Sequence, residues 1–69
     1  MEPITVWLDG VPHAFRLGAQ VWMLVGRLSD PDRTAVGEGR AYIADAAGHE
    51  LGSGGALANG QHLRLVRRR

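Results

Sequence analysis

The chain has 69 residues, enough for one small domain, and its 45% hydrophobic content predicts a globular core rather than disorder. It contains no Cys, which excludes disulfides and thiolate metal sites. The longest apolar run, residues 21–25, is too short for a membrane span, and no signal-peptide pattern opens the chain. We therefore expect a cytoplasmic protein that does not bind membranes.

Charge is distributed unevenly behind the net value of +1. Residues 1–63 hold four Arg and seven acidic side chains, whereas residues 64–69 hold four Arg and no acid. No Lys is present, a bias that a GC-rich, bacterial-type genome produces without any functional cause. We divide the chain into one domain over residues 1–66 and a basic C-terminal tail over residues 67–69.

The N-terminal part predicts a β-hairpin. Residues 4–9 (ITVWLD) alternate between apolar and other side chains, which is typical of a strand. Asp9 and Gly10 both tolerate positive φ and so predict a tight turn into a second strand over residues 11–17. Pro12 cannot donate a ladder hydrogen bond, so the second strand is expected at a sheet edge.

The next segment, residues 20–28, is compatible with two structures. Its apolar side chains at positions 21, 24, 25 and 28 define one helix face, and Pro31 follows shortly afterwards. Gly26, the missing N-terminal cap and the five consecutive apolar residues instead allow a buried strand. We favour the helix; the strand would give a small all-β barrel.

The remaining elements complete an α+β pattern. Residues 29–39 read as a loop with at most one helical turn, capped by Asp30 with Pro31 in the first position. Strands are expected over residues 41–44, in a short return segment ending at Leu51, and over residues 62–66. This order predicts a mixed four- to five-stranded sheet packed on one helix. The expected core comprises Ile4, Val6, Leu8, Phe15, Leu17, Val21, Leu24, Val25, Leu28, Ile43, Leu57, Leu63 and Leu65.

Residues 48–66 (GHELGSGGALANGQHLRLV) resemble the closing segment of ubiquitin-like β-grasp domains, including ubiquitin and TGS domains. The resemblance rests on Gly48, Leu51, Leu57, Gly60, Leu63, Leu65 and Val66. It implies a β-grasp fold whose open sheet face, with the last strand, is the usual contact surface. Conjugated and sulfur-carrying members need a C-terminal Gly-Gly; this sequence ends in Arg67, Arg68 and Arg69, so we expect neither role.

No catalytic, cofactor or metal motif stands out in the sequence. Ser53 has only His49 and Glu50 nearby, and the glycine stretch around Ser53 lacks the Lys of a phosphate-binding loop. The three His share no ligand spacing. We expect a protein that is not an enzyme and that needs no cofactor and no metal.

Two binding functions remain. The first is a protein-interaction module that binds another protein, or a second copy of itself as a homodimer, through an open sheet face. Its expected residues are Trp7, Tyr42, Arg64 and Val66, with Arg16 at the margin. In a structural alternative, Trp7 lies over Arg64 as a cation–π pair. The second function is nucleic-acid binding, specifically an RNA-binding accessory role, through phosphate contacts of Arg64, Arg67, Arg68 and Arg69.

Overall fold

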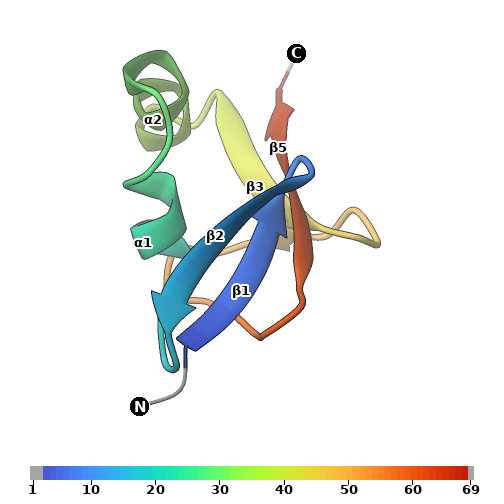
Figure 1. The fold of residues 1–69 in the computed structure, drawn as a ribbon. Helices are drawn as coiled ribbons and strands as arrows, with labels where there is room; N and C mark the ends of the chain where they lie inside the picture. The colour runs from blue at the N-terminus through green and yellow to red at the C-terminus, as the bar shows by residue number, and fades with distance from the viewer. Residues whose placement is uncertain (1–2, 69) are drawn as a thin grey trace.

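The computed structural model describes residues 3–68 and shows an α+β fold with a five-stranded mixed sheet and two short helices (Figure 1). Strand order is β2-β1-β5-β3-β4; β1 and β5 are parallel, and the other neighbouring strands are antiparallel. No helix in this part of the chain is long and apolar enough to cross a bilayer. The elements are β1 (Pro3–Leu8), β2 (Val11–Arg16), α1 (Val21–Val25), α2 (Asp30–Gly37), β3 (Ala41–Asp45), β4 (Glu50–Leu51) and β5 (His62–Arg67).

The predicted N-terminal hairpin is confirmed. β1 and β2 pair in antiparallel register from Pro3 opposite Arg16 to Leu8 opposite Val11. The turn residues Asp9 and Gly10 have φ of 50° and 81°, both in the left-handed region that a tight hairpin turn requires. β2 lies at the edge of the sheet, where a Pro in the strand is tolerated.

Residues 21–25 form helix α1, so the all-β barrel alternative is wrong. The helix is shorter than the predicted span of residues 20–28. After Gly26, the chain continues in tighter turns, in which Leu28 donates to the carbonyl of Val25 at 3.1 Å. The side chains of Val21 and Leu24 are 2% and 0% exposed, so the predicted apolar face does pack on the sheet.

The N-terminus of α1 has no side-chain cap, and the glycine-rich loop provides the missing acceptors. The backbone N–H groups of Val21 and Trp22 donate to the carbonyls of Gly55 and Ser53 at 2.9 and 3.0 Å. A Cβ at Gly55 would lie 3.1 Å from the carbonyl oxygen of Gly52, closer than ordinary contact. The glycine stretch therefore has a structural role in ending α1.

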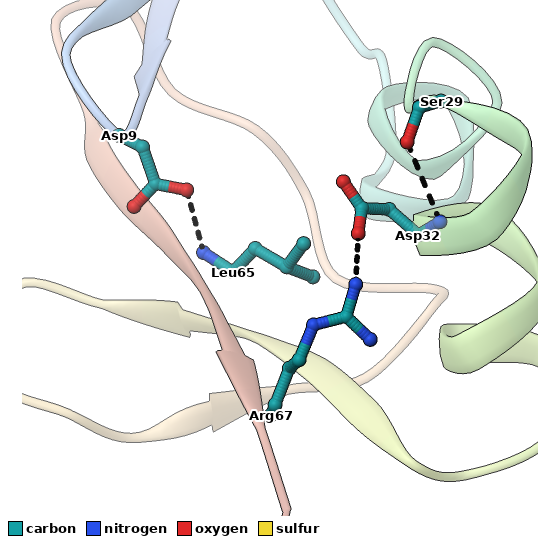
Figure 2. Close-up of polar contacts among 5 residues, drawn as sticks. All are labelled: Asp9, Ser29, Asp32, Leu65 and Arg67. Atoms are coloured by element: carbon teal, nitrogen blue, oxygen red, sulfur yellow. Dashed lines mark hydrogen bonds and ion pairs between the residues drawn. The ribbon is translucent and has the colours of Figure 1, made fainter.

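Helix α2 corrects two expectations, because we predicted only a loop here and only one helix in the chain. Ser29, not Asp30, is the N-cap; its Oγ accepts from the backbone N–H of Asp32 at 3.4 Å (Figure 2). Gly39, with φ of 77°, ends the helix, and Arg40 donates its N–H to the Ala35 carbonyl at 2.8 Å. This is a Schellman-type C-terminus.

Both helices lie on the same side of the sheet, and the core fills the space between them (Figure 1). Every expected core residue is buried or partly buried except Leu17, which is 66% exposed and corrects our prediction. β2 ends at Arg16, and Gly18 turns the chain with φ of 95°, so the strand alternation no longer applies to Leu17. Small residues that we did not expect complete the core: Ala19, Ala35, Ala41 and Ala44.

Strand β5 is joined to β1 by backbone hydrogen bonds in the middle of the pair. Trp7 donates its N–H to the carbonyl of Gln61 at 2.8 Å, and Asp9 donates to Leu63 at 3.0 Å. These bonds make the only parallel pair among the described strands.

Side chains extend this parallel pair at both ends. Asn59 Oδ1 accepts from the N–H of Thr5 at 2.9 Å, at the start of β5. At the other end, Asp9 Oδ2 accepts from the N–H of Leu65 at 3.3 Å (Figure 2). Two turn residues therefore anchor the last strand to the first.

Candidate functional site

The sheet face opposite the helices carries all five predicted protein-binding residues. Register assigns alternate positions of the four longer strands to it, because successive side chains point to opposite faces. We call this set the open face; its larger members are Thr5, Trp7, Pro12, Arg16, Tyr42, His62, Arg64 and Val66.

An aromatic pair occupies the centre of the open face. Trp7 and His62 are register partners in β1 and β5, and their rings stack with centroids 5.8 Å apart and an interplanar angle of 9°. Trp7 is half-buried and His62 is exposed. The stack replaces the Trp7–Arg64 cation–π pair that we considered. It also orders the Trp7 ring before any partner arrives.

Arg64 lies beside this pair and is exposed. Within residues 3–68, salt bridges hold Arg33, Arg40, Arg67 and Arg68, whereas Arg16, Arg27 and Arg64 take part in none. A hollow of about 510 Å³ adjoins Arg64 and His62 and is bordered by Asp9 in the hairpin turn. The open face thus combines a preformed aromatic stack with an Arg whose charge is not neutralised by an ion pair.

Tyr42 and Val66, also predicted site residues, lie at the far side of the open face. They are register partners in β3 and β5, and both are half-buried. Arg68 lies over the Tyr42 ring, with 4.5 Å between its Cζ and the ring centroid, and pairs with Glu50 at 2.6 Å. Arg68 therefore covers part of Tyr42 and leaves Trp7 and Arg64 as the more accessible end.

The other residues predicted to bind nucleic acid have different surroundings. Arg67 is the last residue of β5 and forms an ion pair with Asp32 of α2 (Figure 2). Arg68 donates its backbone N–H to the Arg40 carbonyl at 2.8 Å, which continues the alignment of β5 with β3. Arg69 lies outside the described residues. The structure does not bring Arg67 together with Arg64, since Arg67 is on the helix-covered face.

The residues weighed for catalysis take part in local structure instead. Ser29 caps α2, and Glu50 pairs with Arg68. The Asp45 carboxylate accepts from the backbone N–H of His49 at 2.9 Å, which holds the pKa of Asp45 below its ordinary value. No group of three or more potential metal ligands occurs within residues 3–68.

Sequence reasoning missed one member of the open face and a second surface. His62 was expected to point outward, but nothing in its residue type indicated that it would stack on Trp7. The second surface follows from Leu17, Trp22 and Met23, which are 66%, 53% and 36% exposed. The signal for Trp22 and Met23 was present, because both lie off the apolar face of the predicted helix.

Comparisons of this chain with protein-family models, with curated proteins and with solved structures found no match.

Proposed function

We propose that this chain is a small, non-enzymatic protein-interaction module of the ubiquitin-like β-grasp type, which binds another protein through its open face. The strand order, the parallel β1–β5 pair and the helices on a single sheet face support the β-grasp assignment. The single observation that carries the binding role is the Trp7–His62 stack beside Arg64, a cation in no ion pair within residues 3–68.

This arrangement has the chemistry of a binding hot spot. Trp and Arg are the residue types that contribute most to protein interfaces, particularly where they are central and already ordered. Stacking on His62 holds Trp7 in one orientation, so less side-chain entropy is lost on binding. A partner with apolar and acidic side chains would cover the ring and neutralise Arg64.

Site-specific photo-crosslinking tests the proposal in cells. The chain has no Lys, so amine-reactive reagents would not label its side chains. A photoreactive residue would replace Thr5 on the open face, and a matched control would replace exposed Thr34 on α2. We expect adducts from position 5 that disappear with Trp7→Ala or Arg64→Glu. An adduct of twice the chain's 7.4 kDa would identify the partner as a second copy.

Two results would contradict the open-face proposal. One is the same adducts from positions 5 and 34, and the other is position 5 adducts that survive both substitutions. Circular dichroism of each variant would show whether the fold is retained, so that loss of the fold is not read as loss of binding.

Nucleic-acid binding is a second candidate with weaker support. Two of its four Arg residues, Arg67 and Arg68, already pair with Asp32 and Glu50. We expect no salt-dependent binding of a labelled single-stranded oligonucleotide, because Arg64 alone provides little counterion release. Micromolar binding that falls steeply with salt and depends on residues 67–69 would favour this function instead.

A further inference from the structure

A second candidate surface lies between strand β2 and helix α1, away from the open face. A shallow groove of about 400 Å³ runs between them. Phe15, which is 8% exposed, forms part of its lining, together with the exposed Leu17 and Met23. Apolar side chains that gather in one groove at this level of exposure are typical of interaction sites.

The groove follows a free strand edge, because β2 pairs only with β1 (Figure 1). The N–H groups of Trp7 and Asp9 point toward β5, so those of the alternate residues in β1 point toward β2. Val6 is opposite His13, which places His13 in a hydrogen-bonded pair and turns the N–H and C=O of Ala14 outward. Ala14 therefore offers one donor and one acceptor to an added strand.

The charge at the groove selects the kind of strand. The Arg27 guanidinium lies 3.9 Å from the centroid of the Phe15 ring, and Arg16 lines the same groove. Neither cation takes part in a salt bridge within residues 3–68, and none of the described residues that line the groove is acidic. A second copy of the chain would bring another two cations to this place, whereas an acidic segment would neutralise both.

We propose that the β2 edge and this groove bind an extended, acidic segment of a partner protein, which adds to the sheet as a sixth strand. Its backbone pairs with Ala14, its apolar side chains enter the groove between Phe15, Leu17 and Met23, and its carboxylates approach Arg16 and Arg27. This surface is separate from the open face, so the two proposals stand or fall independently.

Peptide titration followed by 15N–1H NMR tests the proposal directly. The probe is a capped hexapeptide that alternates glutamate and valine, and its charge-reversed control alternates lysine and valine. We expect the acidic peptide to shift the amide signals of residues 14–17 and 23 and to protect the Ala14 N–H from exchange. The lysine peptide should bind at least about 10-fold more weakly, because it places like charges beside Arg16 and Arg27.

Variants separate strand pairing from simple apolar contact. Ala14→Pro removes the outward donor at a position where Pro is tolerated, and should weaken binding about 5-fold. Methylating alternate amide nitrogens of the peptide tests the same hydrogen bonds without altering the protein. Arg27→Gln should weaken binding, whereas Arg64→Gln, a matched change on the open face, should leave it unchanged.

Three outcomes would overturn the proposal. The first is equal binding of the acidic and lysine peptides, and the second is peptide-induced shifts centred on Trp7 instead of Ala14. The third is a concentration-dependent shift of β2 signals without peptide, which would assign the edge to a second copy. A failure of the open-face crosslinks would change none of these readouts.

Discussion

Strands β5 and β2 both neighbour β1, but they are held in very different ways. β5 has a strand on each side, and the side chains of Asp9 and Asn59 extend its pairing with β1. The Arg67–Asp32 ion pair then fixes its C-terminal end to α2. β2 has one neighbour and a free edge. The difference indicates that β5 is the structural centre, and that the hairpin carries surface available for binding.

The largest expected effect contrasts two leucines at the ends of this comparison. Leu63 in β5 is 2% exposed, whereas Leu17 after β2 is 66% exposed. We expect Leu63→Ala to lower the free energy of unfolding by about 2–5 kcal/mol, and Leu17→Ala to change it by less than about 0.5 kcal/mol. Urea unfolding followed by circular dichroism measures both. Similar losses in the two variants would contradict the contrast between the strands.

A smaller effect is expected from the side chain that extends the β1–β5 pair at its start. Asn59→Ala removes the acceptor of the Thr5 N–H and should cost about 1 kcal/mol of unfolding free energy. Asn59→Asp keeps an acceptor oxygen and serves as the matched control, which should lose less. If both variants unfold at the same urea concentration as the unmodified chain, the Asn59 bond contributes nothing to holding β5.

The parts of the fold that sequence predicted are those with strong local signals. Asp9-Gly10 specified the hairpin turn, and the alternation of β1 matched its burial position by position. The spacing of Val21 and Leu24 correctly favoured a helix, although nothing local showed that Ser53 and Gly55 would supply its missing cap.

Helix α2 was missed because its signals compete. Pro31 reads both as a helix stop after residues 20–28 and as a good residue for the first turn of a new helix, and we gave more weight to the first. The Ser29 cap and the Gly39 terminus were both visible in the sequence.

The open face was predicted by alternation alone, but its contacts were not. Period-two patterning places Trp7, Arg64 and Val66 on one face of the sheet, as the register has them. Which side chains touch depends on the parallel β1–β5 register, which brings Trp7 opposite His62. Strand register between chain ends is a long-range property, so sequence reasoning could not choose His62 over Arg64.

The ion pair at the end of β5 should contribute less than the Asn59 bond. Arg67 and Asp32 side chains are 54% and 30% exposed, and partly solvated pairs of this kind are worth about 0.2–1 kcal/mol. A double-mutant cycle of Asp32→Asn and Arg67→Gln measures the coupling, and added salt should reduce it. A coupling of zero at low salt would mean that the backbone ladder alone holds this end of β5.

The smallest effect concerns the turn after β3, which belongs to neither strand of the comparison and so provides a baseline. Hydrogen bonds from the His49 and Ala47 N–H groups to the carboxylate hold the pKa of Asp45 below its ordinary value of 3.8. A pKa that is lower in the folded than in the unfolded state contributes stability above the unfolded value, and this contribution is lost as pH falls through the folded value.

The stability difference between the unmodified chain and Asp45→Asn should therefore be constant near neutral pH and should shrink once the pH falls below 3.8. Asn keeps one acceptor oxygen for the turn but does not titrate, so the change isolates the charge. NMR titration of the Asp45 carboxyl carbon gives the folded midpoint, and urea unfolding across the acid range gives the stability. A folded midpoint at or above 3.8 would show that the turn amides do not favour the ionised carboxylate, and the difference between the two chains would then lose its predicted pH dependence.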